Sequence, residues 1–247
     1  IRTGFVKTVS WKWIGTDITR IYIADVRQFD REDAFEEALD LVSPYRRQKI
    51  ALLQNRQDKN RSLGAAFALR QALQAYGLEE RCMEYDLGEQ GKPVLRDYPQ
   101  IRFSLSHAGD YAICSIGEAD NGCDIEWVRK DKEALAKRFF AEEELAWLRQ
   151  ASHPEERAER MFRIWTMKES FLKVTGFGMS LSLRDFAILI GENGEIGIRQ
   201  AVNDKRYFMK EYAAPKEAEA GRTYKVSVCC EKAGFAPEME SVFYHMS

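Results

Sequence analysis

The chain has 247 residues, which is enough for one or two domains with a substantial core. Its composition, 45% hydrophobic and 31% charged, is typical of a soluble globular protein, and no apolar run approaches the roughly 18 residues that span a bilayer. The net charge of -2 excludes a global basic field of the kind that attracts nucleic acid. Five cysteines without a Cys-x-x-Cys pair predict reduced thiols in a cytoplasmic protein, and neither a zinc site nor a disulfide scaffold.

The first part of the chain predicts one strand followed by three helices. Apolar and polar residues alternate in the strand, Asp30 is a candidate N-cap of the first helix, and Pro44 suits the first turn of the second. The expected elements are a strand over residues 18–26 and helices over residues 30–41, from Ser43 onward, and from about Asn60 to Tyr76, with a stop at Gly77.

Two basic side chains of the second helix fall on one side of it. Arg46 and Lys49 are three residues apart, and residues at this spacing are neighbours on a helix surface. Taken alone, such a pair is more often a solvated basic face than a ligand site.

A turn and a hairpin follow the helices. Residues 88–93 read Gly-Glu-Gln-Gly-Lys-Pro, a turn by composition, which taken alone is a connector with an exposed Lys92. Residues 101–107 and 111–116 are expected to form a hairpin around an Ala-Gly-Asp turn. His107 ends the first of these strands, and a histidine in such a place is more often a structural hydrogen-bonding residue than a ligand contact.

The stretch from Gly122 to Trp127 predicts a strand that carries two carboxylates. Asp124 and Glu126 point to the same face, about 6–7 Å apart along the strand. Two like charges so close repel each other unless a cation lies between them. For this pair alone, two solvated acids at a strand edge are the more frequent case.

A helix is expected from Glu159 to Val174, with Gly176 as its C-terminal cap. Its apolar residues form one stripe, and Glu169 and Lys173, four residues apart, share a face at the edge of that stripe. Such a pair alone is most often a surface ion pair. Together with the two strand carboxylates, however, Glu169 completes a set of three oxygen donors that could hold Mg²⁺, an ion that commonly bridges to substrate phosphates.

The remaining elements are expected to be a helix and two pairs of strands. Residues 132–149 read as mostly helical, and the charge-rich residues 155–160 read as a solvated link into the next helix. An Asn-Gly pair predicts a hairpin turn between residues 186–190 and 196–198. Further strands are expected over residues 207–212 and 224–230.

Two of these stretches together resemble the 4'-phosphopantetheinyl transferases of the surfactin-synthetase-activating (Sfp) type. The family pattern is an apolar-Gly-apolar-Asp-apolar-Glu strand, followed downstream by Trp-[Ser/Thr]-x-Lys-Glu-[Ser/Ala]-x-x-Lys. Residues 122–126 and 165–173 match it, and Cys123 stands where a branched apolar residue is usual. Residues 136–140 also look like the family, and the resemblance extends from about Ser43 to Leu183.

The resemblance implies roles for individual residues. In the family, a basic pair on the second helix contacts phosphates of coenzyme A, a Gly-Lys-Pro turn cradles its adenine side, and a Phe-x-Leu-Ser-His motif binds its 3'-phosphate. Lys168 is left as either a secondary phosphate contact or a packing residue. By this resemblance, coenzyme A contacts are expected from Arg46, Lys49, Arg61, Ser62, Lys92, Pro93, Ser106, His107, Asp124 and Lys173, catalytic roles from Glu169 and Lys173, and Mg²⁺ ligands from Asp124, Glu126 and Glu169.

The fold implied by the resemblance is α+β. It consists of two similar α+β halves in a pseudo-two-fold arrangement, with the active site in the cleft between them. Residues 1–119 would form the half that contacts coenzyme A, and residues 120–247 would form the half with the metal carboxylates and the catalytic helix. A glycine-rich loop over residues 176–179 is expected to line the entrance for pantetheine or carrier.

The implied function is Mg²⁺-dependent transfer of 4'-phosphopantetheine from coenzyme A to a serine of an apo carrier protein, with release of adenosine 3',5'-bisphosphate. The expected partners are coenzyme A and an acyl, peptidyl or polyketide carrier, with no nucleic acid and no membrane, and the protein is expected to be a cytoplasmic monomer. Which carrier is modified, whether acylated coenzyme A is accepted, and whether Mn²⁺ replaces Mg²⁺ all stay open.

Two other functions stay open at this point. The three carboxylates would equally serve a different Mg²⁺-dependent phosphoryl-transfer or hydrolytic enzyme. A non-catalytic module that binds coenzyme A or a carrier is the second alternative, although Glu169 and Lys173 would then have no chemical purpose.

Overall fold

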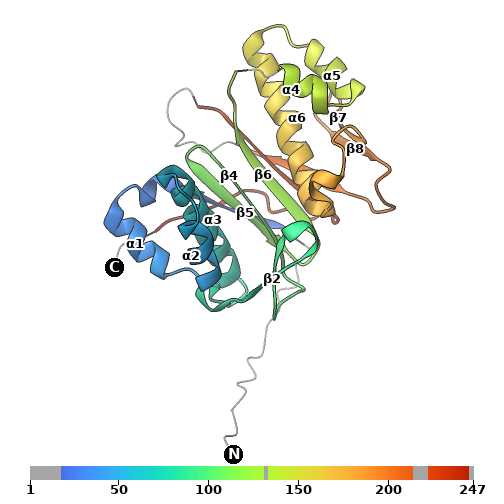
Figure 1. Cartoon of the computed structure of the whole chain (residues 1–247). Coiled ribbons are helices and arrows are strands. Elements are labelled where there is room, and N and C mark those ends of the chain that lie inside the picture. Colours follow the sequence, from blue (N-terminus) through green and yellow to red (C-terminus); the bar gives the residue numbers. More distant parts are fainter. Residues whose placement is uncertain (1–17, 131–132, 214–221, 245–247) are drawn as a thin grey trace, which may run out of the picture.

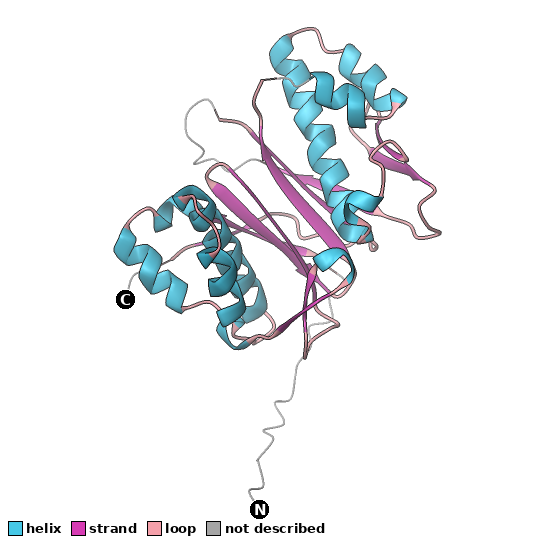
Figure 2. Cartoon of the chain, in the orientation of Figure 1, coloured by secondary structure: helices cyan, strands magenta, loops and turns pink. Residues whose placement is uncertain are grey.

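The structure is a computed structural model, and it describes residues 18–130, 133–213 and 222–244. Two units meet along their sheets, and each carries its long helix on the outer side (Figure 1, Figure 2). The order of layers is therefore helices, sheet, sheet, helices. This arrangement confirms the expected α+β class.

The first unit comprises, in chain order, β1 (Arg20–Asp25), η1 (Val26–Phe29), α1 (Glu32–Asp40), α2 (Pro44–Ala51), α3 (Arg56–Gln74), η2 (Glu80–Cys82), β2 (Tyr85–Leu87), η3 (Glu89–Gly91), β3 (Pro93–Leu95), β4 (Arg102–Ala108) and β5 (Tyr111–Gly117). Strand β5 pairs antiparallel with both β1 and β4. Tyr22 and Ala24 of β1 are buried in one cluster with Leu63 and Phe67 of α3, so this helix covers one face of the sheet.

The second unit comprises β6 (Asn121–Trp127), α4 (Glu133–Phe139), α5 (Glu142–Arg149), α6 (Pro154–Thr175), η4 (Gly178–Ser180), β7 (Phe186–Ile190), β8 (Ile196–Gln200), β9 (Phe208–Tyr212), β10 (Tyr224–Cys230) and β11 (Glu240–Val242). Strand β10 pairs antiparallel with both β6 and β9. Helix α6 covers this sheet, and the Ser170 hydroxyl donates to the Ser227 carbonyl oxygen of β10 at 3.1 Å.

The two units repeat one topology, as expected. In each, a first strand (β1 or β6) leads through helices and a small hairpin (β2–β3 or β7–β8) to a strand pair (β4–β5 or β9–β10). The second strand of that pair returns to pair with the first strand of the unit. The long helix before the hairpin, α3 or α6, packs on the sheet. This correspondence is the pseudo-two-fold arrangement.

An apolar layer between the two sheets joins the units. Ile21 and Ile23 of β1 lie in one buried cluster with Cys123, Ile125 and Val226 of the second sheet. Because side chains alternate across a strand, these residues face the partner sheet while their neighbours face the helices.

The C-terminal strand crosses from the second unit to the first. Strand β11 pairs in parallel with β1, with Tyr22 opposite Glu240 and Ala24 opposite Val242. The first sheet therefore has the order β11-β1-β5-β4. The expected division of function between residues 1–119 and 120–247 stays a prediction. Strand β11, although it comes from the second part of the chain, belongs to the sheet of the first.

Two helix starts differ from expectation. Asp30 does not cap α1. It follows η1 and accepts a hydrogen bond from Asn60 Nδ2 at 2.8 Å, while Arg31 takes the N-cap position without a side-chain bond. Helix α3 begins at Arg56, where the Asn55 side chain caps the helix, because an N-cap asparagine accepts from the free backbone N–H groups. Asn60 is therefore inside the helix.

The second-half helices also depart from the expected bounds. The span 132–149 contains two helices, α4 and α5, with a break after Phe139, and residue 132 lies outside the described residues. The residues 155–160 expected as a link are the first turns of α6, which begins at Pro154 because proline suits the first helical position. The cap at Gly176 is confirmed by its left-handed φ of 73°.

Within the described ranges, we find no helix that has both the length and the apolar character needed to cross a membrane.

Candidate active site

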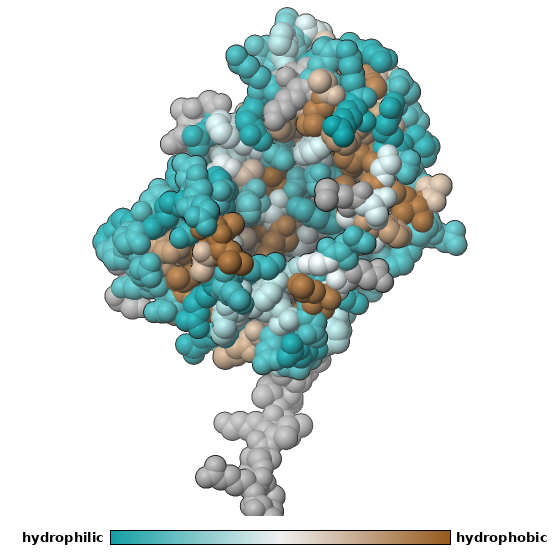
Figure 3. All heavy atoms as spheres, viewed as in Figure 1, coloured by the Kyte–Doolittle hydropathy of each residue, from teal (hydrophilic) through white to brown (hydrophobic). Residues whose placement is uncertain are grey.

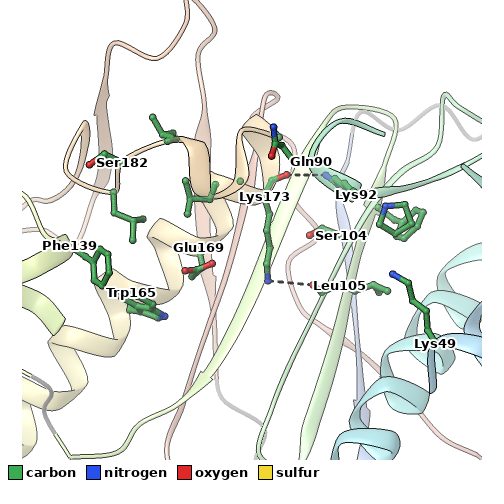
Figure 4. Close-up of a pocket in the computed structure, with 18 of the residues that line it drawn as sticks. Lys49, Gln90, Lys92, Ser104, Leu105, Phe139, Trp165, Glu169, Lys173 and Ser182 are labelled. Atoms are coloured by element: carbon green, nitrogen blue, oxygen red, sulfur yellow. Dashed lines mark hydrogen bonds between the residues drawn. The ribbon is translucent and has the colours of Figure 1, made fainter. Parts of the chain in front are cut away.

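A cavity of about 920 Å³ lies between the two units, and the hollow is visible in Figure 3. The first unit contributes α2, the loop before β3, and β4. The second contributes α4, α6 and the loop after α6, as the close-up in Figure 4 shows. Six of the expected site residues line it, namely Arg46, Lys49, Lys92, Pro93, Glu169 and Lys173.

Lys173 joins the two units at the floor of this cleft. Its ammonium donates to Asp124 Oδ1 at 2.8 Å and to the carbonyl oxygens of Cys123 at 3.0 Å and Leu105 at 3.4 Å. Burial alone would lower the pKa of Lys173, but the neighbouring acidic groups, Asp124 foremost, together outweigh it and raise the pKa. The side chain is therefore a fixed cation.

The approach of α6 to β6 depends on Gly122. A Cβ atom at this position would lie 2.2 Å from the Ser170 carbonyl oxygen and 2.6 Å from the Val174 nitrogen, both backbone atoms of α6. Only glycine permits this close packing. The glycine of the strand motif therefore brings Asp124 within reach of Lys173.

The three expected carboxylates lie near one another and interact electrostatically. Burial and the neighbouring Asp124 charge raise the pKa of Glu169, and the same two causes raise the pKa of Glu126 to about 7. Asp124 Oδ2 is buried and has no hydrogen-bond partner. An unpaired buried oxygen among acidic groups that repel one another is an environment that a cation would stabilise.

No three His, Cys, Asp or Glu side chains within the described ranges converge closely enough to form a preassembled metal cluster. Asp124 Oδ1 is engaged by Lys173 and by the Ser106 hydroxyl at 2.6 Å. Glu126 lies 3.5 Å from an Arg129 guanidinium nitrogen. Of the three carboxylates, only Glu169 lines the cavity, and Asp124 has a buried Oδ2 without a hydrogen-bond partner. The metal assignment stays a prediction.

Arg46 and Lys49 do share one side of α2, and both face the cavity. The Arg46 guanidinium carbon lies 5.2 Å from the ring centre of Tyr85, 5.5 Å from that of Tyr45 and 6.0 Å from that of Phe103. This aromatic enclosure leaves Arg46 only 7% exposed, and its Nε and Nη2 atoms have no hydrogen-bond partner. Buried donors without partners favour an anionic ligand.

A buried carboxylate supports this enclosure, and sequence reasoning missed it. Glu80 is fully buried and accepts hydrogen bonds from the Ser43 nitrogen, the Ser43 hydroxyl and the Tyr85 hydroxyl. Ser43 caps α2, and Tyr85 stacks on Tyr45. Glu80 lies in a short 3-10 turn that has no pattern of its own, so the sequence held no signal for this role.

Lys92, at the end of the turn before β3, and Pro93, the first residue of β3, line the cavity. Gln90 and Gly91 both have left-handed backbones, with φ of 56° and 76°, and they turn the chain sharply. The Lys92 ammonium donates to two backbone carbonyls of the second unit, Asn121 at 3.0 Å and Lys173 at 3.1 Å. Burial lowers the pKa of Lys92.

Ser106, His107, Arg61 and Ser62 do not line this cavity. The Ser106 hydroxyl is bonded to Asp124, and Arg61 donates to Asp58 at 2.5 Å. His107 is exposed at the end of β4, and the pKa of its imidazole is lowered by partial desolvation and by the positive charges of Arg61 and Lys173. These four residues lie beside the cleft, at the end of β4 and on α3.

Lys168 is a packing residue and not a phosphate contact. It is fully buried and donates to Glu144 Oε1 at 2.6 Å and to the Phe186 carbonyl oxygen at 2.9 Å. Of the two roles left open for it, only the packing role agrees with this position.

Across the cleft from α2, the wall is largely apolar. Phe139 of α4, Trp165 and Leu172 of α6, and Leu181 and Leu183 after η4 line it (Figure 4). The sequence placed Trp165 on the apolar stripe of its helix and at the start of the family motif, but gave it no role in the site. Neither α4 nor the segment after η4 could be placed on the cleft without the tertiary fold.

Several known proteins are similar to this chain in sequence. A sequence profile of the 4'-phosphopantetheinyl transferase superfamily matches residues 121–229. The chain is 31% identical over 204 residues to a 4'-phosphopantetheinyl transferase of Bacillus subtilis, covering 82% of this chain and 88% of that protein. It is also 31% identical over 185 residues to the 4'-phosphopantetheinyl transferase psf-1 of Bacillus pumilus, covering 74% and 76%.

Among solved structures, a holo-(acyl-carrier-protein) synthase from Bacillus anthracis in complex with coenzyme A (3',5'-ADP) aligns with a TM-score of 0.38 and 16% identity. The alignment covers 45% of this chain and 93% of that one.

The chain belongs to the 4'-phosphopantetheinyl transferase family. It is therefore a transferase, and the transferases of Bacillus subtilis and Bacillus pumilus align with most of its length.

Proposed function

We propose that the cleft binds coenzyme A and transfers its 4'-phosphopantetheine group to the hydroxyl of a serine on an apo acyl, peptidyl or polyketide carrier protein. The observation that carries this proposal is the distribution of charge around one cavity. Arg46 and Lys49 of the first unit supply cations on one wall, and Glu169 and Lys173 of the second unit lie on the facing wall. A diphosphate ester between the walls would meet cations from both.

The first unit would hold the nucleotide end of coenzyme A. Arg46 and Lys49 are proposed to contact phosphate, since Arg46 has unpaired buried donors and Lys49 is exposed on the cavity. The turn at Lys92 and Pro93 would flank the adenine side through its backbone, since the Lys92 ammonium is bonded to the carbonyl oxygens of Asn121 and Lys173. Four further expected contacts, Arg61, Ser62, Ser106 and His107, lie outside the cavity wall. They are proposed to contact the 3'-phosphate and the nucleotide of a coenzyme A molecule that extends beyond the cavity, past β4.

Asp124, Glu126 and Glu169 are the residues that would hold Mg²⁺. The unpaired Asp124 Oδ2 and the raised pKa values of the two glutamates support this donor set, because all three are oxygen donors in a site that favours positive charge. When bound, the ion would neutralise charge on the phosphoryl oxygens.

Glu169 is proposed as the general base. Its pKa is raised by burial and by Asp124, which makes the carboxylate a stronger proton acceptor. It would take the proton of the serine hydroxyl as the serine oxygen forms a bond to the pantetheine-side phosphorus. The phosphorus–oxygen bond to the nucleotide then breaks, and adenosine 3',5'-bisphosphate leaves with the electron pair.

Lys173 would stabilise the charge that develops on the diphosphate in this step. Its ammonium is held in place by Asp124 and two carbonyl oxygens, so little reorganisation is needed as the charge forms. The protein itself supplies no covalent nucleophile in this scheme.

The test is incubation of the protein with coenzyme A, Mg²⁺ and a panel of apo carriers, followed by mass spectrometry of the carriers. The proposal expects a mass gain of one phosphopantetheine on at least one carrier. Glu169→Gln should abolish the gain while circular dichroism and melting stay those of the wild type. Normal transfer by this variant would exclude Glu169 as the base.

A further inference from the structure

Lys92 lies on the cavity wall, yet its ammonium is directed at the protein. Its two hydrogen bonds reach across to the second unit, to the carbonyl oxygens of Asn121 and Lys173, and Figure 4 shows the second of them. These two acceptors belong to the strand and the helix that carry the carboxylates, β6 and α6. Lys92 therefore connects the first unit to both elements of the catalytic floor.

The Lys173 carbonyl requires a donor from outside its helix. Helix α6 ends at Thr175, and the last four carbonyls of a helix have no intrahelical partner. The Leu172 carbonyl is satisfied by the Gly176 nitrogen at 3.2 Å and the Thr175 hydroxyl at 3.0 Å. Lys92 supplies the donor for the next carbonyl, and a cation there also complements the negative end of the helix dipole.

The other acceptor lies on a rigid frame. Asn121 is fully buried, and its side-chain amide bonds the Ser115 hydroxyl and the carbonyl oxygens of Arg102 and Ala119. The next residue, Gly122, is where β6 and α6 approach most closely. Lys92 thus ties the end of the catalytic helix to a fixed point on the strand beside it.

Lys173 is consequently held at both of its ends. Lys92 bonds its backbone carbonyl, while Asp124 and two carbonyl oxygens bond its ammonium. A displacement of the last turn of α6 would move this ammonium relative to Glu169 on the preceding turn. Misplacement of a catalytic group by about 1 Å can cost on the order of 100-fold in rate.

We propose that Lys92 is a positioning residue, whose ammonium fixes the last turn of α6 against β6 and thereby sets the place of Lys173 in the cleft. This inference rests on the proposed function, since it assigns Lys173 to the reaction. It gives Lys92 a role in the rate of transfer that is separate from any contact with the adenine side of coenzyme A.

Lys49 provides a matched contrast on the same cavity. It is exposed, and its Nζ atom lies 5.0 Å from the centre of the Tyr45 ring. Within the described residues it has no hydrogen bond or ion pair. Its ammonium is available to a ligand, whereas two of the three donors of Lys92 are taken. Removal of each charge should therefore change different quantities.

The experiment compares Lys92→Met, Lys92→Arg and Lys49→Met in the full chain. The dissociation constant of coenzyme A is measured by calorimetry, and kcat and KM are measured in the carrier-loading assay. Amide hydrogen exchange of residues 120–124 and 171–178 is measured without ligand. Lys92→Met should lower kcat about tenfold or more, change the dissociation constant less than about twofold, and speed exchange in both segments.

Lys92→Arg should recover most of kcat, because a guanidinium can also donate to two carbonyls. Lys49→Met should weaken coenzyme A binding and leave exchange in these segments unchanged. If Lys92→Met instead weakens coenzyme A binding and leaves exchange as in the wild type, the positioning role is wrong and Lys92 is a ligand contact. If the wild type loads no carrier, the proposed function fails, but the exchange data still decide whether Lys92 fixes α6.

Discussion

Helix α6 carries two lysines in very different surroundings, although both belong to one short motif. Lys168 bonds Glu144 at 2.6 Å with both side chains 0% exposed, while Lys173 bonds Asp124 at 2.8 Å with side chains 30% and 7% exposed. Nearly equal distances thus describe one pair enclosed in a core and another on a cleft. The distance within an ion pair does not distinguish structure from function, but the state of its remaining donors and acceptors does.

Every polar atom of the buried pair has a hydrogen-bond partner. Glu144 also accepts hydrogen bonds from the Ala141 and Ile188 nitrogens at 2.7 Å each, and Lys168 donates to the Phe186 carbonyl oxygen. The cleft pair leaves Asp124 Oδ2 without a partner. A satisfied buried pair positions elements, here α5, α6 and β7, whereas an unsatisfied pair at a cavity is able to bind something else.

The largest effect is expected where the buried pair is broken. Lys168→Met leaves the Glu144 carboxylate buried without its cation, which should lower the free energy of unfolding by about 3–5 kcal/mol. Denaturant unfolding followed by circular dichroism measures this loss. Transfer per folded molecule should not change at a temperature where the variant is folded. A weakened affinity for coenzyme A with full stability would instead restore Lys168 as a phosphate contact.

A paired variant sharpens this prediction. Ala141 and Ile188 donate to different Glu144 oxygens, so adding Glu144→Gln to Lys168→Met keeps only one of these two hydrogen bonds, but it removes the unpaired buried charge, which is the larger penalty. The double variant should therefore be more stable than Lys168→Met alone. Equal stabilities of the two would mean that lost packing of the lysine stem, and not the buried charge, causes the destabilisation.

The opposite result is expected at the cleft. Lys173→Met should lower kcat for transfer about 100-fold or more, the magnitude typical of losing one group that stabilises transition-state charge. Its stability should change less than that of Lys168→Met, because the carboxylate left behind keeps the Ser106 hydrogen bond and the lysine that is removed is itself 30% exposed. Parallel kcat and melting measurements check this. Severe unfolding with unchanged kcat would reverse the comparison.

The sequence could predict the parts of this molecule that local pattern determines. The motif residues from Gly122 to Glu126 and from Trp165 to Lys173 located the strand and helix of the cleft floor, and the hairpins and the Gly176 cap followed from turn chemistry. The resemblance to a family added the pseudo-two-fold fold. These predictions concern residues that are near one another in sequence or share one motif.

What could not be predicted depends on long-range packing. The spacing of Lys168 and Lys173 on a helix indicates different faces, but not that one face meets Glu144, 24 residues away, in a closed core. Likewise, nothing in the local sequence of Lys92 shows that its ammonium reaches a carbonyl 81 residues away. Burial of Glu80 and the crossing of β11 to the first sheet are determined in the same way, by the tertiary fold.

The smallest expected effect is a pH dependence of coenzyme A binding that comes from His107, a titratable group beside the cleft. Its pKa is lowered from the usual 6.5, first by partial desolvation and then by the charges of Arg61 and Lys173, so the free imidazole is neutral at pH 7. An anionic phosphate beside the ring would raise that pKa. Binding would then take up a proton, and by linkage affinity should rise as pH falls from 7 toward 6.

Coenzyme A and its 3'-dephosphorylated analogue separate this effect from other titrations. The affinity for coenzyme A should increase several-fold over that pH range, by less than the tenfold per pH unit that one proton allows, and the increase should be smaller for the analogue. His107→Ala should remove the difference between the two ligands, and calorimetry at three pH values measures it. Equal losses for both ligands in His107→Ala would separate this histidine from the 3'-phosphate. His107 would then have no part in phosphate binding.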